Sequence, residues 1–239
     1  MKRQLLLLPL LAVVAACSSA APYVTTVGAL KTGSVMTIEV NDAALGAYQP
    51  AAGQPRHVFT VAATARTKAS PPPPPQILGR RGGVTISAPA PLASLLVRVP
   101  DGVDLIVKSR DGDVTVVDIT GNASIEAAHG DVTAMLPGYA QAAVGQGNLS
   151  VTMGSTTWPG TLHFSSGRGD VTIYIGAKAS FHAHLHTQDG VLFTDFGLRG
   201  TSVGRAETID GDINGGGGHG IDVNASSGDI RLLRLQPQA

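Results

Sequence analysis

A short phrase, Gly-Asp-Val or a close variant, recurs seven times in the second half of the chain and constrains the fold more than any other feature. The copies begin at Gly112, Gly130, Gly147, Gly169, Gly190, Gly211 and Gly228. The differences between successive glycine numbers are 18, 17, 22, 21, 21 and 17. A period of about 20 residues is typical of stacked repeat units. The spacing therefore predicts that this half of the chain is built from similar layers.

Apolar residues occupy fixed places relative to each repeat glycine. Two positions after it stand Val114, Val132, Leu149, Val171, Leu192, Ile213 and Ile230. Five before it stand Val107, Ile125, Ala142, Phe164, Leu185, Ala206 and Val223, and seven before it Leu105, Ala123, Ala140, Leu162, Ala183, Gly204 and Ile221. A spacing of two is the alternation of a β-strand, so these positions are predicted to form inward columns. Each unit then holds two short strands, with glycine where a corner needs positive φ or close backbone approach.

These columns favour an all-β fold, and its simplest form is a single-stranded, right-handed β-solenoid of about 20-residue coils. Neighbouring coils would lie about 4.8 Å apart along the axis. An antiparallel β-sandwich built from the same strands is the alternative. No segment of ten or more residues shows sustained apolar spacing at 3.6, so very little helix is expected.

The first residues are typical of an exported protein. Lys2 and Arg3 precede an apolar run from Leu5 to Ala16, which indicates a signal peptide over residues 1–16. Val14-Ala15-Ala16-Cys17 resembles the lipobox of bacterial lipoproteins, in which the cysteine is acylated and becomes the mature N-terminus. The resemblance implies lipidation at Cys17, the only cysteine in the chain, and a membrane partner through that anchor. Ser18 and Ser19 follow the cysteine, which in that family favours the outer membrane.

Beyond the cysteine, three further segments are expected. Residues 17–33 are predicted to be the lipidated N-terminus and a tether, and residues 34–94 an N-terminal β segment. Within that segment, residues 35–40 and 57–66 alternate as strands do, and the five prolines of 71–75 predict a stiff loop. The β-repeat domain is expected over residues 95–235.

Charge argues against nucleic acid as a partner. Lys and Arg number 17, as do Asp and Glu, and removal of Lys2 and Arg3 leaves 15 against 17, a net charge of −2. A chain without an excess of positive charge lacks the usual means of holding phosphates. Nothing in the sequence calls for a cofactor.

The repeat, the lipobox and one C-terminal stretch together carry a family resemblance. Residues 215–232 read Gly-Gly-Gly-Gly-His-Gly-Ile-Asp-Val-Asn-Ala-Ser-Ser-Gly-Asp-Ile-Arg-Leu. The chain thus resembles the putative-adhesin family of bacterial β-strand-repeat lipoproteins, a domain of unknown function, over roughly residues 95–235. The resemblance implies a β-helical surface domain without assigned catalytic residues.

The residue after the repeat glycine forms a column of its own, Asp113, Asp131, Asn148, Asp170, Val191, Asp212 and Asp229. Asp and Asn in such places commonly cap a turn through side-chain to backbone hydrogen bonds. We therefore expect a structural role. Neighbouring carboxylates about 4.8 Å apart could alternatively share a bound cation.

Histidine is concentrated at His182, His184 and His186, which alternate along one strand. In a solenoid with coils in sequence order, His163 would lie beside His184. Imidazoles on one face can share zinc or copper, so these four residues are the candidate metal ligands. An exposed polar face is the simpler explanation, since the sequence indicates no carboxylate beside them.

The preferred hypothesis is a non-catalytic, adhesin-like surface on a lipid-anchored envelope protein, with a surface glycan or another envelope protein as partner. A carbohydrate-active enzyme on a β-helix is one alternative, and a surface metal-binding module is another. A cleft lined by three or more acids would favour the enzyme, whereas a smooth face with Thr115, Thr133 and Thr172 in a column would favour binding.

Overall fold

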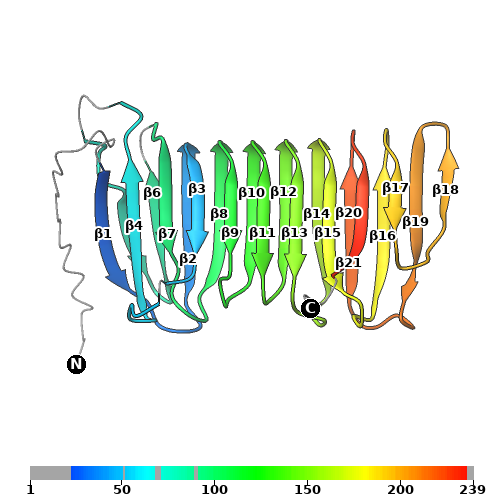
Figure 1. Ribbon diagram of the computed structural model, residues 1–239, viewed down its shortest axis with the longest axis horizontal. Helices are drawn as coiled ribbons and strands as arrows, with labels where there is room; N and C mark the ends of the chain where they lie inside the picture. The colour runs from blue at the N-terminus through cyan, green and yellow to red at the C-terminus, as the bar shows by residue number, and fades with distance from the viewer. Residues whose placement is uncertain (1–22, 51, 68–70, 89–90, 236–239) are drawn as a thin grey trace.

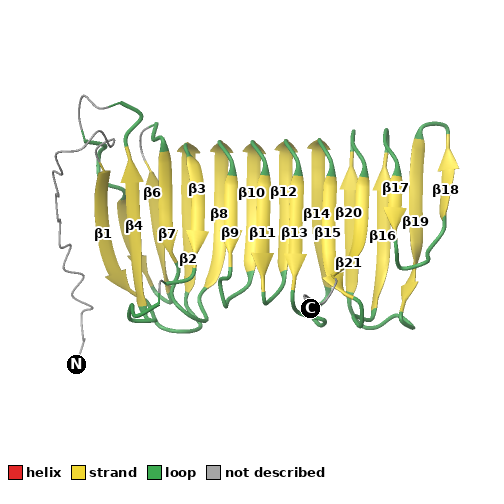
Figure 2. Ribbon diagram, viewed as in Figure 1, coloured by secondary structure: helices red, strands yellow, loops and turns green. Residues whose placement is uncertain are grey.

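A computed structural model describes residues 23–50, 52–67, 71–88 and 91–235. The proposed signal peptide and Cys17 lie outside these residues. The described chain forms two large sheets that face each other along a rod, with the strands perpendicular to the long axis (Figure 1). It contains no helix (Figure 2), and so no helix with the length and hydropathy to cross a membrane. The prediction of an all-β fold is confirmed.

The first sheet, called sheet A, has ten strands. In spatial order they are β1 (Tyr23–Ala29), β4 (Val58–Thr64), β7 (Ser94–Arg98), β3 (Ala44–Tyr48), β9 (Val114–Val117), β11 (Val132–Leu136), β13 (Leu149–Met153), β15 (Val171–Gly176), β21 (Ile230–Leu235) and β17 (Leu192–Thr194).

The second sheet, called sheet B, has eleven strands. In spatial order they are β18 (Gly200–Val203), β19 (Ala206–Ile213), β16 (Phe181–Thr187), β20 (Gly220–Ala225), β14 (Thr161–Arg168), β12 (Ala140–Gln146), β10 (Ala123–His129), β8 (Asp104–Asp111), β2 (Val35–Asp42), β6 (Gly83–Ala88) and β5 (Gln76–Arg80).

Each coil of the rod is one strand of sheet B followed in the chain by one strand of sheet A. Between β6/β7 and β16/β17, the pairs follow the same order in both sheets and all neighbouring strands are parallel. Two strands and two corners to a unit are what the repeat predicts. Parallel pairing through the repeat favours the solenoid over an antiparallel sandwich.

The coils are not stacked in sequence order. The last coil, β20/β21, lies between β14/β15 and β16/β17, so that Ile230 pairs with Val171, 59 residues earlier. At the other end, β6/β7 lies outside β2/β3. Strand β21 is thus an interior strand of sheet A, between β15 and β17, and not an edge of the rod. The periodic pattern fixes which residues face inward but not which coil a unit packs against.

Antiparallel strands close both ends of the rod. β1 and β4 extend sheet A and β5 extends sheet B at one end, whereas β19 and β18 extend sheet B at the other. Of the segment predicted as a tether, 17–33, residues 23–29 form β1 and belong to sheet A. Val24 and Thr26 of that strand are buried, which explains why this small, polar segment pairs with the sheet.

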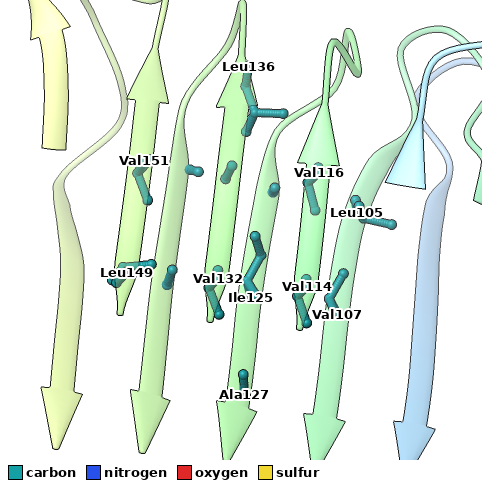
Figure 3. Close-up of a cluster of buried hydrophobic side chains, with 14 of the residues drawn as sticks. Leu105, Val107, Val114, Val116, Ile125, Ala127, Val132, Leu136, Leu149 and Val151 are labelled. Atoms are coloured by element: carbon teal, nitrogen blue, oxygen red, sulfur yellow. The ribbon is translucent and has the colours of Figure 1, made fainter. Parts of the chain in front are cut away.

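The inward columns form the core in six of the seven units, although Leu192 of the Gly190 unit is only partly buried against that core. Val114, Val132, Leu149 and Val171 line up in register in sheet A, at most 1% exposed, and Figure 3 shows the first three among the side chains between the sheets. One core cluster runs from Met36 to Leu232, through the N-terminal segment and the repeat alike.

The unit at Gly211 is the exception: Ile213 is buried as predicted, but the other two predicted inward positions and the corner are wrong. Gly211 lies inside β19, an antiparallel strand, and not at a corner. Gly204 is exposed and Ala206 only half-buried, so neither belongs to the core. The phrase Gly-Asp-Ile at 211–213 therefore lies within a strand that runs antiparallel to β16 and does not mark a corner.

Glycine is required where consecutive corners stack. Gly147 has φ +140°, and a Cβ on it would lie 2.1 Å from the carbonyl oxygen of Gly130. A Cβ on Gly169 would lie 2.2 Å from the Gly147 oxygen, and one on Gly228 2.2 Å from the Gly169 oxygen. The corner glycines thus form a close-packed column of backbone along the rod, as their recurrence predicts.

Candidate functional site

The Asp column makes hydrogen bonds from one coil to the next. Asp131 N–H donates to Asp113 Oδ1 at 2.9 Å, and Asn148 N–H donates to Asp131 Oδ1 at 2.8 Å. Asp170 N–H continues the series to Asn148 Oδ1 at 3.0 Å, and Asp229 N–H to Asp170 Oδ1 at 2.9 Å. We expected each side chain to cap its own turn. Instead, each side-chain oxygen accepts a hydrogen bond from the backbone of the neighbouring coil.

This series of hydrogen bonds, here called the Asp ladder, ends at Val191, which is the one apolar residue of the column. Val191 N–H donates to Asp229 Oδ1 at 3.0 Å, and its coil is the last of the parallel stack. A side-chain acceptor at position 191 would have no further coil to serve. Asp212 stands outside the ladder, on β19, where it contacts His182.

Three histidines of β16 face the solvent on sheet B. Phe181, Ala183 and Leu185 are fully buried, so the alternating His182, His184 and His186 point outward, as predicted. β16 lies between β20 and β19, and the three imidazoles therefore have neighbours on both sides.

His163 is not directly beside His184. β20 separates their strands, and Asp222 pairs with both residues, so the prediction of adjacent imidazoles is wrong. The error follows from the insertion of the last coil. His163 Nδ1 lies 3.2 Å from Asp222 Oδ2.

Carboxylates that the sequence did not indicate accompany the imidazoles. His182 Nδ1 lies 2.9 Å from Asp212 Oδ1, and His184 Nδ1 lies 2.9 Å from Asp210 Oδ2. His182 Nε2 is 3.4 Å from the same Asp210 oxygen. His186 Nδ1 instead meets Thr208 Oγ1 at 3.0 Å. The alternation Asp210-Gly211-Asp212 was the available signal, but its use required knowledge that β19 pairs antiparallel with β16, with β17 and β18 between them in the chain.

These contacts change the proton affinity of two groups. The hydrogen bond to Asp212, supported by Asp210, raises the pKa of His182 above its ordinary value of 6.5. The hydrogen bond from His184, with the charge of His182, lowers the pKa of Asp210 below its ordinary value of 3.8. Both groups are solvent-exposed, so the charges are paired but well hydrated.

The four predicted metal ligands do not already surround one point. Within the described ranges, no group of three or more His, Cys, Asp or Glu side chains is arranged to hold an ion. The structure thus brings His182 and His184 together around Asp210, leaves His163 with Asp222, and leaves His186 with a hydroxyl.

The outer face of sheet A carries two aligned rows. Thr115, Thr133, Ser150 and Thr172 are paired across β9, β11, β13 and β15, so the predicted Thr column is present. The second row consists of Val117, Met135, Thr152, Tyr174 and Leu233. Met135 is 48% exposed and the others are half-buried. Hydroxyl groups therefore run beside accessible apolar groups along the rod.

The outer face of sheet B has a shallow, open depression of about 610 Å³. Glu39, Lys108 and Glu126 are neighbours across β2, β8 and β10, and Ala143 and Ser165 lie further along the depression. Its lining contains two acids, which is fewer than the three that would favour a carbohydrate-active enzyme.

Comparisons with known proteins identify a family. Residues 104–233, more than half of the chain, match the model of a family described as Toastrack DUF4097. This match confirms the resemblance seen in the sequence. No curated protein matches the chain.

Solved structures show weaker likenesses. A putative cell adhesion protein from Clostridium sporogenes is 12% identical with a TM-score of 0.47, over 88% of this chain and 99% of that one. A putative adhesin from Bacteroides fragilis is 10% identical with a TM-score of 0.39, over 89% and 97%. At these scores the likenesses bear on neither ligand nor activity.

Proposed function

The chain belongs to the Toastrack DUF4097 family, and we propose that it is a non-catalytic, adhesin-like binding or structural surface of the bacterial envelope. A lipid on Cys17 holds it at the outer membrane. Its partner is a surface glycan or another envelope protein. We take its coils, of about 20 residues, to be right-handed, as nearly all parallel β crossovers are.

The observation that carries this proposal is the outer face of sheet A. Hydroxyls of Thr115, Thr133, Ser150 and Thr172 recur from strand to strand, at the roughly 4.8 Å spacing of a sheet. Threonine and serine can donate and accept hydrogen bonds, as sugars and exposed strands require. The adjoining row with Met135 and Tyr174 supplies apolar contact.

Rigidity supports the same role. The two sheets share one core, and the corners are tied by the Asp ladder, so the face has a fixed geometry before any partner arrives. A preorganised surface loses little conformational entropy on binding. The open depression on sheet B, with its two acids and two cations, supports no specific reaction, and we propose no catalytic role for it.

Site-specific photo-crosslinking in the native envelope tests the binding face. A crosslinker at Thr133 or Met135 is expected to capture one recurrent envelope component, whereas one at Gln141, exposed on sheet B, is the matched control. Equal capture from both faces, or none from sheet A, would overturn the assignment of the face. Purified envelope polysaccharide, added to the isolated protein, distinguishes a glycan partner from a protein.

Cell fractionation tests the anchor separately. The Cys17→Ser variant is expected to leave the outer-membrane fraction and to appear in a soluble one. Retention of this variant in the membrane would contradict lipidation at Cys17.

A further inference from the structure

We propose that His182, His184 and Asp210 form a binding site for one zinc or copper(II) ion on the outer face of sheet B, a function distinct from the binding face of sheet A. The three residues come from two antiparallel neighbours, β16 and β19, in which His184 pairs directly with Asp210. Two imidazoles and a carboxylate are a ligand set that suits either metal and leaves a position for water.

The present distances are close to those that a metal ion needs. Bonds of about 2.0–2.2 Å from zinc to nitrogen and oxygen, at tetrahedral angles, place two ligand atoms roughly 3.3 Å apart. Asp210 Oδ2 lies 2.9 Å from His184 Nδ1 and 3.4 Å from His182 Nε2. One carboxylate oxygen therefore already has a nitrogen of each imidazole at about the ligand-to-ligand spacing.

A small rearrangement completes the site. The three side chains do not yet surround a common point, so at least one imidazole must turn about its side-chain torsions. His182 and His184 are 48% and 43% exposed, and a change between staggered rotamers meets no packed core there. Their strand is fixed by pairing on both sides, which keeps the Cβ atoms in place during this rotation.

An outer carboxylate orients one ligand. Asp212 accepts a hydrogen bond from His182 Nδ1–H. His182 Nε2 is then directed to Asp210 and is available as a ligand atom. Metal-bound histidines commonly carry such a carboxylate on their second nitrogen, and its removal weakens metal binding by about 10- to 100-fold. Asp212 is thus a positioning residue in this site.

Local charge also favours a cation. In the part of the chain that the structure describes, the ion pairs of Asp210, Asp212 and Asp222 are all with imidazoles. A dication bound at Asp210, beside Asp212, would therefore displace no lysine or arginine from these carboxylates.

The same sheet supplies a matched control. His129 Nδ1 lies 3.1 Å from Asp111 Oδ1, on strands β10 and β8, and this pair has one imidazole only. If a lone His–Asp pair were enough to capture the ion, His129→Ala would reduce binding as much as His184→Ala does.

Isothermal titration of the mature, tag-free chain with zinc or copper(II) at neutral pH tests the site. We expect one ion per chain with Kd tighter than about 10 μM, and at least tenfold weaker binding in His184→Ala and Asp210→Asn. Asp212→Asn is expected to weaken binding although all three ligands are retained. His129→Ala and His186→Ala are expected to bind as the parent does.

Several results would overturn the proposal. Binding no tighter than about 100 μM would remove the site altogether. Equal losses in His129→Ala, or a loss in His186→Ala without one in Asp210→Asn, would place the ion elsewhere. Electron paramagnetic resonance of the copper-loaded parent protein gives a reading independent of variant folding, and fewer than two coordinated nitrogens would refute the ligand set.

Discussion

Replacement of Gly147 by alanine tests how tightly the corners of the coils are packed. The added Cβ would lie 2.1 Å from the Gly130 carbonyl oxygen and 2.6 Å from its carbon, and the φ of +140° is one that residues with a Cβ rarely adopt. The neighbour here is backbone, which cannot move aside as a flexible side chain could. Either the two coils separate at this corner or the corner changes its conformation.

The expected loss in the free energy of unfolding follows from the hydrogen bonds at that corner. Gly147 N–H donates to Arg168 O at 2.9 Å, and Asn148 N–H donates to Asp131 Oδ1 at 2.8 Å. Weakening of two such bonds at about 1 kcal/mol each, with about 2 kcal/mol of backbone strain, gives a loss of roughly 4 kcal/mol. For a chain of this size, that lowers Tm by about 8–16 °C.

Gly160→Ala is the matched control. Gly160 also has positive φ, +63°, but nothing lies within 4 Å of the added Cβ. Gly160→Ala should therefore lose only the cost of placing a residue with a Cβ at positive φ, about 1 kcal/mol of stability or 2–4 °C in Tm. Calorimetry or circular dichroism of both variants compares them directly. Equal shifts in Tm for the two variants would refute the argument that close stacking, and not φ alone, requires glycine at position 147.

Three further outcomes are expected. Asp131→Ala should lose about 1 kcal/mol in urea unfolding because the Asn148 N–H loses its acceptor, whereas Asp131→Asn, which keeps an acceptor oxygen, should be near neutral; equal losses would argue against the ladder. Val171→Asp should lose on the order of 5 kcal/mol because Val171 is fully buried, whereas the half-exposed neighbour Thr172→Asp should lose less than about 1 kcal/mol, and an unchanged melting curve for Val171→Asp would contradict the core column. In the metal-free chain, NMR titration should place the pKa of His182 above 6.5, and Asp212→Asn should lower it. The stability that this pair contributes is fully present below pH 6.5 and is lost as pH rises through the raised pKa. A pKa of His182 at or below 6.5 in the parent protein would contradict this prediction.

The local structure of the coils could be predicted from the sequence, because it depends on short-range alternation. The apolar columns require only that alternate residues face inward, and the corner glycines mark where the backbones stack. The Asp column was recognised for the same reason. Each of these features repeats within one unit, so a single chain displays it several times.

The order of the coils could not be predicted in this way. β20 pairs with β14 and with β16 through the same alternation of residues, and nothing in its own sequence indicates which strands will be its neighbours. As a result, the carboxylate between His163 and His184 was missed, although Asp222 is plain in the sequence. One signal was present: Val191 lacks the side-chain acceptor of its equivalents, which marks its coil as the last of the parallel stack.

The interior position of β20/β21 has a consequence for how the molecule is made. Residues 220–235 are synthesised after β14/β15 and β16/β17, yet they form the layer between these two earlier ones. A chain truncated before them would lack a middle layer, whereas most repeat proteins lose an end layer on truncation. Until residues 220–235 are present, β14/β15 and β16/β17 lack the layer that lies between them in the finished rod, so completion of the rod waits for this segment.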